Sequence, residues 1–195
     1  MFTQNSHEPK SESLFTRGVN PFLGKKDKEW STRDEQSAED EVSEFLYGLI
    51  RLIKPSVVIE TGCYEGDTTE AMAIALKDNN FGKLYACDID SYRVKKVRDR
   101  ISTLGLPAQI LCMTGRELIL QMGSVPDFAF IDSSPDGKIR GEEINTLLPF
   151  LRPLSMFALH DTAPQHPTIA SVAGMINLPK VYLNTPRGLT LFQKI

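Results

Sequence analysis

Residues 57–67 read Val-Val-Ile-Glu-Thr-Gly-Cys-Tyr-Glu-Gly-Asp, which predicts a buried strand running into a glycine-rich turn. The opening apolar run contains β-branched residues, as is typical of strands inside a sheet. Two glycines four residues apart follow it, Gly62 and Gly66. Asp67 and Glu70 have the spacing of a capping box, in which two side chains bind the free backbone N–H groups of a helix start. We therefore predict a helix with Asp67 as its N-cap.

A strand, a glycine-rich turn and a helix N-terminus in this order form a cradle for a ligand. Glycine lets the backbone approach a bound molecule closely, and the free N–H groups of the helix favour negative charge. Tyr64 lies inside the turn, where its ring would line a ligand pocket. The spacing Gly62-x-x-x-Gly66 differs from the Gly-x-Gly-x-x-Gly of dinucleotide-binding proteins, so it counts against a dinucleotide.

The composition indicates a globular protein without a membrane anchor. The chain has 195 residues, 41% of them hydrophobic, and its net charge of -3 argues against a general nucleic-acid binder. No apolar run approaches the ~20 residues of a membrane span, and the polar N-terminus lacks the layout of a secretory signal. Cys63, Cys87 and Cys112 form no Cys-x-x-Cys pair, so we expect reduced core cysteines in a cytoplasmic protein.

Strand and helix patterns alternate along most of the chain. Strands are predicted over 57–60, 84–88, 108–113, 127–132 and 156–159, and helices over 42–53, 68–77, 94–104, 116–122, 134–148 and around 169–176. Ser134, with Pro135 at the first helical position, marks the start of the helix over 134–148. Residues 181–183 and 189–192 predict a terminal hairpin. Five β-α repeats require a mostly parallel, doubly wound α/β sheet with helices on both faces.

The first 36 residues differ from the remainder, which we assign to one domain over 37–195. They are rich in Ser, Glu, Lys and Asn and show little periodicity, which is typical of a disordered arm. A lid is the alternative, because the arm carries several large apolar residues: Phe15, Val19, Phe22, Leu23 and Trp30.

Each predicted parallel strand ends in polar residues that are able to bind or catalyse. In chain order they are Glu60, Asp88 with Asp90, Thr114-Gly115-Arg116, Asp132 and His160-Asp161. Ligands of doubly wound sheets bind outside the carboxyl ends of the strands, where the winding direction reverses. One acid at a strand end is ordinary surface, whereas five polar ends in succession predict a site.

Two parts of this site have distinct chemistry. Asp88 lies about twenty residues past the glycine turn, where a carboxylate can accept both hydroxyls of a ribose. Asp90 can cap the following helix, which leaves Asp88 for a ligand. Asp132 and the pair His160-Asp161 permit either a hard-cation site or a general base facing a substrate hydroxyl. Helix capping by these acids is the structural alternative.

The motifs together resemble a known family. Val57-Val-Ile-Glu-Thr-Gly-Cys-Tyr-Glu-Gly66, Ala86-Cys-Asp-Ile-Asp90 and Phe128-Ala-Phe-Ile-Asp132 are similar to successive motifs of class I S-adenosylmethionine-dependent methyltransferases. Leu159-His-Asp-Thr162 looks like small O-methyltransferases related to catechol O-methyltransferase, and like bacterial tailoring methyltransferases whose fifth strand ends in His-Asp. The resemblance implies a Rossmann-like seven-stranded sheet in the order 3-2-1-4-5-7-6, with strand 7 antiparallel.

The resemblance also implies a role for each motif residue. Glu60, Gly62, Tyr64 and Thr68 would hold the methionine end of S-adenosylmethionine, within a cradle that includes Cys63 and Gly66. Asp88 would bind the ribose hydroxyls, Ile89 would lie against the adenine, and Thr114, Gly115 and Arg116 would edge the adenine pocket. Asp132 would border both the cofactor and the acceptor. Asp132, His160 and Asp161 would be the catalytic residues and, in metal-dependent relatives, the ligands of Mg²⁺.

Two positions depart from the catechol-type pattern. Pro135 stands where those relatives carry a lysine base, which leaves His160 or a metal-activated hydroxyl as the candidates for that function. Pro153-Leu-Ser155 replaces the usual Pro-Gly-Gly before the fifth strand, which alters only a turn.

The expected activity is O-methylation of a small molecule, such as a sugar, phenolic or natural-product hydroxyl. We expect no nucleic-acid or membrane partner, and a homodimer stays open. The alternatives are an NAD-dependent oxidoreductase, which the glycine spacing disfavours, and a non-catalytic protein that binds a nucleotide or a partner on the same fold. Intact cradle glycines and Asp88 favour retained cofactor binding in either case.

Overall fold

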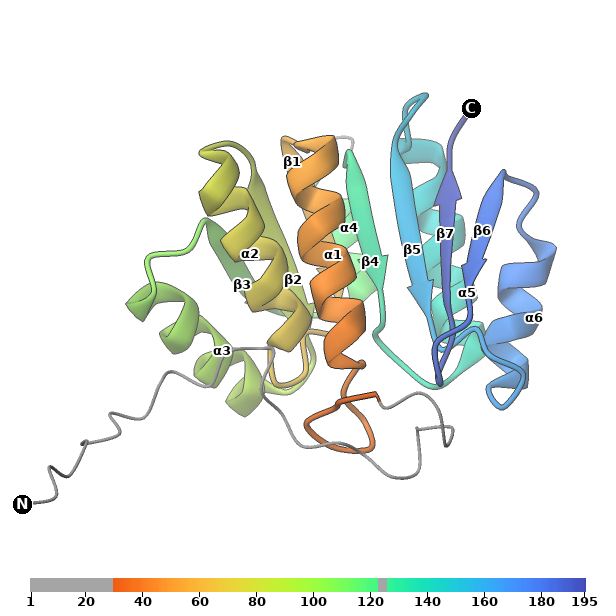
Figure 1. Ribbon diagram of the computed structural model, residues 1–195, viewed down its shortest axis with the longest axis horizontal. Coiled ribbons are helices and arrows are strands. Elements are labelled where there is room, and N and C mark those ends of the chain that lie inside the picture. Colours follow the sequence, from red (N-terminus) through yellow and green to blue (C-terminus); the bar gives the residue numbers. More distant parts are fainter. Residues whose placement is uncertain (1–29, 123–125) are drawn as a thin grey trace, which may run out of the picture.

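The computed structural model describes residues 30–122 and 126–195, which form one seven-stranded sheet between helices (Figure 1). The strands are β1 (Val57–Thr61), β2 (Lys83–Asp88), β3 (Ala108–Cys112), β4 (Phe128–Ile131), β5 (Met156–His160), β6 (Lys180–Leu183) and β7 (Leu189–Gln193). The helices are α1 (Asp40–Ile53), α2 (Asp67–Asn79), α3 (Ser91–Thr103), α4 (Gly115–Met122), α5 (Gly137–Leu147) and α6 (Pro167–Met175), with the short 3-10 helix η1 (Leu148–Phe150) after α5.

The strand order confirms the predicted topology. The order is β3-β2-β1-β4-β5-β7-β6, and the first five strands of the chain pair in parallel. β7 runs antiparallel to both of its neighbours, β5 and β6, as the predicted hairpin requires. The chain winds from β1 outward to β3 and then returns to β4 on the other side of β1. The carboxyl ends of β1 and β4 therefore flank the switch point at which ligands of such sheets bind.

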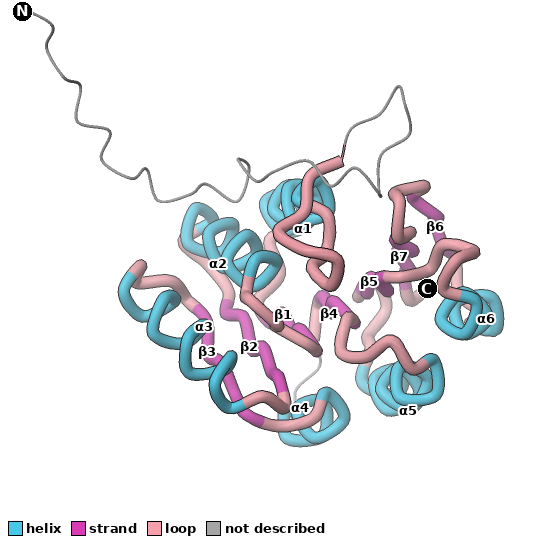
Figure 2. Tube along the Cα trace, turned by 90° about the horizontal axis from the view of Figure 1, so that it is seen from below, coloured by secondary structure: helices cyan, strands magenta, loops and turns pink. Residues whose placement is uncertain are grey.

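Helices cover both faces of the sheet (Figure 2). Apolar residues of α1, α2 and α3 pack on one face, and those of α4, α5 and α6 pack on the other. Strand residues alternate between these two cores: Phe128 and Phe130 belong to the first, Ala129 and Ile131 to the second. Because both faces are buried, the central strands read as continuous apolar runs rather than as alternating ones.

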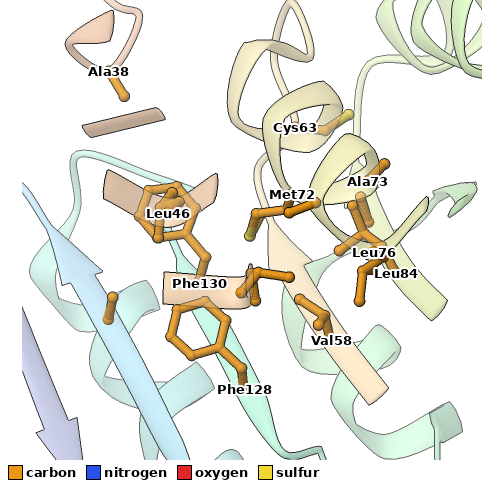
Figure 3. Close-up of a cluster of buried hydrophobic side chains, with 14 of the residues drawn as sticks. Ala38, Leu46, Val58, Cys63, Met72, Ala73, Leu76, Leu84, Phe128 and Phe130 are labelled. Atoms are coloured by element: carbon orange, nitrogen blue, oxygen red, sulfur yellow. The ribbon is translucent and has the colours of Figure 1, made fainter. Parts of the chain in front are cut away.

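Figure 3 shows the first core, in which the two phenylalanines of β4 lie among side chains from α1 and α2. Phe128, Phe130, Leu46 and Met72 are each fully buried. Full burial of one such side chain stabilises the fold by roughly 1.5–3 kcal/mol. This packing fixes β1 and β4, the two strands whose ends flank the switch point.

Two predicted helix starts are wrong. Gly66, with a φ of 83°, occupies the N-cap position of α2, and the carboxylate of Asp67 binds the guanidinium of Arg33 instead of capping the helix. α5 begins after Asp136, whose side chain accepts a hydrogen bond from Lys138 N, while Ser134 lies in the preceding turn. At α5 a second polar residue, Asp136, took the N-cap position that the local pattern assigned to Ser134, whereas at α2 a glycine occupies it.

Most of the predicted arm, residues 1–29, lies outside the described residues, so the arm and lid alternatives stay predictions. Within the described ranges, no helix combines the length and the apolar character that a bilayer crossing needs.

Candidate functional site

The loop between β1 and α2 forms the cradle and needs glycine at two positions. Gly62 has a φ of 82°, and a Cβ atom on it would lie 2.3 Å from the carbonyl oxygen of Asp132. Gly66 has a φ of 83°, and a Cβ there would meet Val97 at 2.8 Å. Both positions therefore combine a left-handed backbone with a contact too close for any side chain. The turn is held against β2, because the backbone N–H groups of residues 62 and 63 both donate to the carbonyl of Cys87.

The Asp88 carboxylate is oriented by the backbone at the end of β2. Tyr64 N donates to its Oδ2 at 3.0 Å, and Asp90 N donates to its Oδ1 at 2.9 Å. Asp90 is the N-cap of α3, with its side chain accepting from Tyr92 N and Arg93 N, as predicted. The Asp88 side chain therefore does not cap α3, and it lines the cavity.

A cavity of about 400 Å³ lies at the carboxyl ends of the strands, which is within the size range of small-molecule sites. Nine of the predicted site residues line it: Gly62, Cys63, Tyr64, Gly66, Thr68, Asp88, Ile89, Asp132 and Asp161. Residues that were not predicted also line it: Glu35–Ala38 before α1, Arg93 over the Tyr64 ring, Arg140 of α5 and Arg187 before β7. The site thus combines the cradle, Asp88 and the acids at the ends of β4 and β5.

The other predicted residues lie outside the cavity wall. Glu60 is fully buried behind the cradle, where it accepts hydrogen bonds from the hydroxyls of Thr68 and Thr69. Burial, only partly offset by these two hydroxyls, raises the pKa of Glu60 to about 7. The Glu60 carboxyl therefore holds the first turn of α2 through Thr68 and Thr69. Of these two threonines, only Thr68 lines the cavity, so Glu60 would act on a ligand only through Thr68.

The adenine-edge residues are occupied in local structure. The hydroxyl of Thr114 accepts from Glu117 N, and the Glu117 carboxylate accepts from Thr114 N, which is a capping box for α4. Gly115 is buried against Glu143, where a Cβ would lie 2.2 Å from a carboxylate oxygen. Arg116 is exposed. Their proposed contact with adenine remains a prediction.

The predicted catalytic residues converge at the ends of β4 and β5. Atoms of Asp132, His160 and Asp161 able to bind a metal lie within 4.8 Å of one another. His160 Nδ1 is 3.3 Å from Asp132 Oδ2 and 3.5 Å from Asp161 Oδ1. His160 is fully buried, however, and it is absent from the cavity wall. Of the three, only the two carboxylates face a bound molecule.

Three charged residues that the sequence patterns did not indicate surround this cluster. Arg140 Nη2 lies 2.7 Å from Asp132 Oδ1 and 2.9 Å from Asp161 Oδ2. Arg187 Nε donates to Asp161 Oδ1 at 2.6 Å. The carboxylate of Glu39 lies 2.8 Å from His160 Nε2 and also accepts from the backbone N–H of Arg187. Segments more than one hundred residues apart in the chain therefore meet in one ion network.

Buried neighbours of opposite charge set the protonation of this network. Burial alone would lower the pKa of His160, but the carboxylate of Asp132, with those of Glu39 and Asp161, outweighs it and raises the pKa to about 10. Burial alone would raise the pKa of Glu39, yet the His160 ring holds this pKa at about 2. The pKa of Asp161 is likewise held well below its usual range, by His160 and the two guanidinium groups, against the effect of burial.

These contacts count against the predicted magnesium ligands. Mg²⁺ requires near-octahedral oxygen ligands at ~2.0–2.1 Å. Both oxygens of Asp161, and one oxygen of Asp132, already bind guanidinium groups. His160 Nδ1 lies 3.3 Å from Asp132 Oδ2 and 3.5 Å from Asp161 Oδ1, and the residue does not line the cavity. The donor set does not fit the ion, and the metal assignment stays a prediction.

One sequence signal could have revealed Arg140. It lies four residues before Ile144 and seven before Leu147, so it occupies the buried face of α5, where a lone cation needs partners. Glu39 and Arg187 carry no such signal, because one precedes a helix and the other lies in a hairpin turn, both ordinary places for a charge.

The fold and the cradle define the class of protein as the class I S-adenosylmethionine-dependent methyltransferases. A family model described as a methyltransferase domain matches residues 59–162, which is more than half of the chain, so the chain belongs to that family. No curated protein matches the sequence closely enough to count as a relative.

Solved structures share the fold at low identity. A methyltransferase of Podospora anserina, PaMTH1, bound to SAH is 13% identical with a TM-score of 0.72, over 83% of this chain and 81% of its own. The O-methyltransferase TomG of Streptomyces achromogenes in complex with SAM is 14% identical with a TM-score of 0.68, over 82% of each chain. An rRNA methylase of Streptococcus thermophilus is 18% identical with a TM-score of 0.61, over 80% of this chain and 95% of its own.

Proposed function

We propose that this chain transfers a methyl group from S-adenosylmethionine to an oxygen of a small molecule. The observation that carries the proposal is the position of Asp88, which is oriented by backbone N–H groups beside the glycine cradle. The same cavity contains Asp132 and Asp161. Two structures that share the fold are complexes with SAH or SAM, which supports the cofactor assignment.

The residues of the cradle fit this cofactor. Gly62 and Gly66 let the turn pack closely against Asp132 and Val97 with both glycines at the cavity wall, where the methionine part would lie, and Asp88 would accept the two ribose hydroxyls. Tyr64 and Ile89 would enclose the nucleoside. The sulfonium supplies an electrophilic methyl group when it is bound, so the protein has mainly to align an acceptor oxygen and remove its proton.

Asp132 is the residue best placed to take that proton. Its carboxylate lines the cavity, whereas His160 is buried behind it and cannot contact an acceptor. Arg140 holds one oxygen of Asp132 in place, so the carboxylate is fixed before an acceptor hydroxyl arrives. We therefore assign Asp132 as the general base that takes the proton of the acceptor hydroxyl, with no step through a metal.

Calorimetric titration with S-adenosylmethionine tests the cofactor assignment. We expect Asp88→Ala to weaken binding by at least ~100-fold, because two hydrogen bonds from the ribose to a charged group are lost. Asp90→Ala is the matched control, since it removes the neighbouring carboxylate, which caps α3 and does not line the cavity. Equal affinities of wild type and Asp88→Ala would remove the cofactor from the proposal.

The class of acceptor rests on the cavity and the charge. A cavity lined by Asp88, Asp132 and Asp161, in a chain of net charge -3, suits a small hydroxyl compound better than a polyanion. A radiolabelled-methyl assay with sugars, phenols and ribosomal RNA as separate acceptors tests this. Label appearing in the RNA alone would contradict a small-molecule acceptor. A cytoplasmic location and a homodimer remain predictions.

A further inference from the structure

Arg140 stands where the acids of β4 and β5 come closest. Its guanidinium makes five hydrogen bonds: to the carbonyls of Ser134, Ile131 and His160, and to the carboxylates of Asp132 and Asp161. A guanidinium has five N–H donors, so every one of them is used. The side chain of Arg140 is only 2% exposed, as is that of Asp161. A single buried cation thus bridges the two acids.

We infer that Arg140 is the resident cation of the acceptor side and that the site binds no divalent metal ion. This inference rests on the proposed methyl transfer only in that this part of the cavity is called the acceptor side. Arg140 acts as a positioning residue, because it holds both carboxylates and all five of its N–H donors are already bound within the protein.

Guanidinium groups bind three of the four carboxylate oxygens of Asp132 and Asp161. Asp132 Oδ1 and Asp161 Oδ2 bind Arg140, and Asp161 Oδ1 binds Arg187. Among the described contacts, only Asp132 Oδ2 is left without a guanidinium partner. A divalent ion would have to displace Arg140 or sit within a few ångströms of its charge, and like charges at such distances repel strongly in a buried site.

The backbone makes displacement of Arg140 costly. Its Nη1 binds the carbonyl of Ile131 at 3.1 Å and that of His160 at 2.9 Å, at the ends of β4 and β5. A cation that left would strand these two carbonyls and would remove a partner from the buried Asp161 and from the partly exposed Asp132. The guanidinium is therefore part of the sheet edge, and the two acids are preset at a fixed spacing without a metal.

Titration with Mn²⁺, followed by electron paramagnetic resonance of the free ion, tests the inference without an acceptor. We expect wild type to show no site with a dissociation constant below ~1 mM, and Arg140→Met to bind Mn²⁺ at least ~10-fold more tightly because the acids lose their cation. Lys138→Met is the matched control, since it removes an exposed positive charge from the same helix and should bind as wild type does. Arg140→Gln replaces Arg140→Met if the latter does not fold.

Stoichiometric Mn²⁺ binding by wild type that Asp132→Asn abolishes would overturn the inference. So would a folded Arg140→Met that binds no more Mn²⁺ than wild type. Calorimetry with S-adenosylmethionine on the same wild-type sample separates the two proposals: failure to bind the cofactor removes the methyl-transfer assignment and leaves the Mn²⁺ result standing.

Discussion

The two halves of the strand-end cavity are built differently. At β1 and β2, the cradle and Asp88 are shaped by backbone: two glycines with positive φ, and N–H groups that orient one carboxylate. At β4, β5 and β7, the cavity is bordered by buried side-chain ions, with Arg140 and Arg187 holding Asp161 between them. A backbone-built site follows from a short stretch of sequence, whereas an ion network depends on the whole fold.

The largest effect that separates the halves is expected from Asp161→Asn. Asparagine tolerates the left-handed φ of 62° at this position, so the substitution changes the charge while keeping the backbone. The buried guanidinium of Arg140 and the partly exposed guanidinium of Arg187 lose the negative charge that they share, and we expect the free energy of unfolding to fall by about 3–5 kcal/mol in urea denaturation.

A substitution in the backbone-built half, at β1 and β2, should lower the free energy of unfolding much less. Asp88→Asn, which keeps one acceptor oxygen for one of its two backbone N–H partners, should cost about 1 kcal/mol. Asp99→Asn, in an exposed pair with Lys95, should leave the unfolding curve unchanged. If Asp161→Asn costs no more than Asp88→Asn, the two halves do not differ in the way described.

The same contrast explains what could be predicted from sequence. The mostly parallel sheet, the cradle glycines and the freedom of Asp88 from capping follow from local patterns: apolar runs, glycine spacing and the presence of Asp90. The strand order follows from the resemblance to the methyltransferase family. The contacts of Asp161 and His160 do not follow from local patterns, because Glu39 and Arg187 reach them from opposite ends of the chain. Even the wrong helix start at Asp67 has this cause, since a distant arginine binds its carboxylate.

A smaller effect is expected from Glu60, the buried acid behind the cradle. Its pKa is raised from 4.5 to about 7, so it stabilises the fold fully below pH 4.5, and this stabilisation is lost as the pH rises through 7. Glu60→Gln cannot titrate. We therefore expect wild type to lose about 2 kcal/mol relative to this variant between pH 5 and 7, measured by urea denaturation.

The pKa shifts of Glu39 and His160 occur in both wild type and Glu60→Gln, so they cancel in the difference between the two free energies of unfolding. Glu142→Gln on the exposed side of α5 is the control for replacing a carboxylate by an amide outside the cradle. A difference between wild type and Glu60→Gln that stays flat with pH would mean that Glu60 is ionised in the folded protein. The backbone-built half would then contain a buried charge of its own, and the contrast would weaken.

The smallest effect concerns Arg33, which ties the segment before α1 to the cradle helix. Its Nε and Nη2 each lie 3.0 Å from an oxygen of Asp67, but the arginine side chain is 31% exposed. Water and salt screen such a pair, so Arg33→Met should change global stability by less than ~1 kcal/mol. Amide hydrogen exchange over residues 32–38 should nevertheless become about 5-fold faster, since local opening costs less free energy.

Arg51→Met provides the control for that change, because Arg51 lies on α1 and its guanidinium binds Asn79 outside the cavity. Exchange over 32–38 should not respond to it. Unchanged exchange in Arg33→Met would show that the segment is held by the contacts of Glu39 and of the Glu35 carbonyl with Arg187 instead. The segment before α1 would then be anchored by the ion network and by the hydrogen bond from the Tyr64 hydroxyl to Asp34 Oδ2, and the pair of Arg33 with Asp67 would add little.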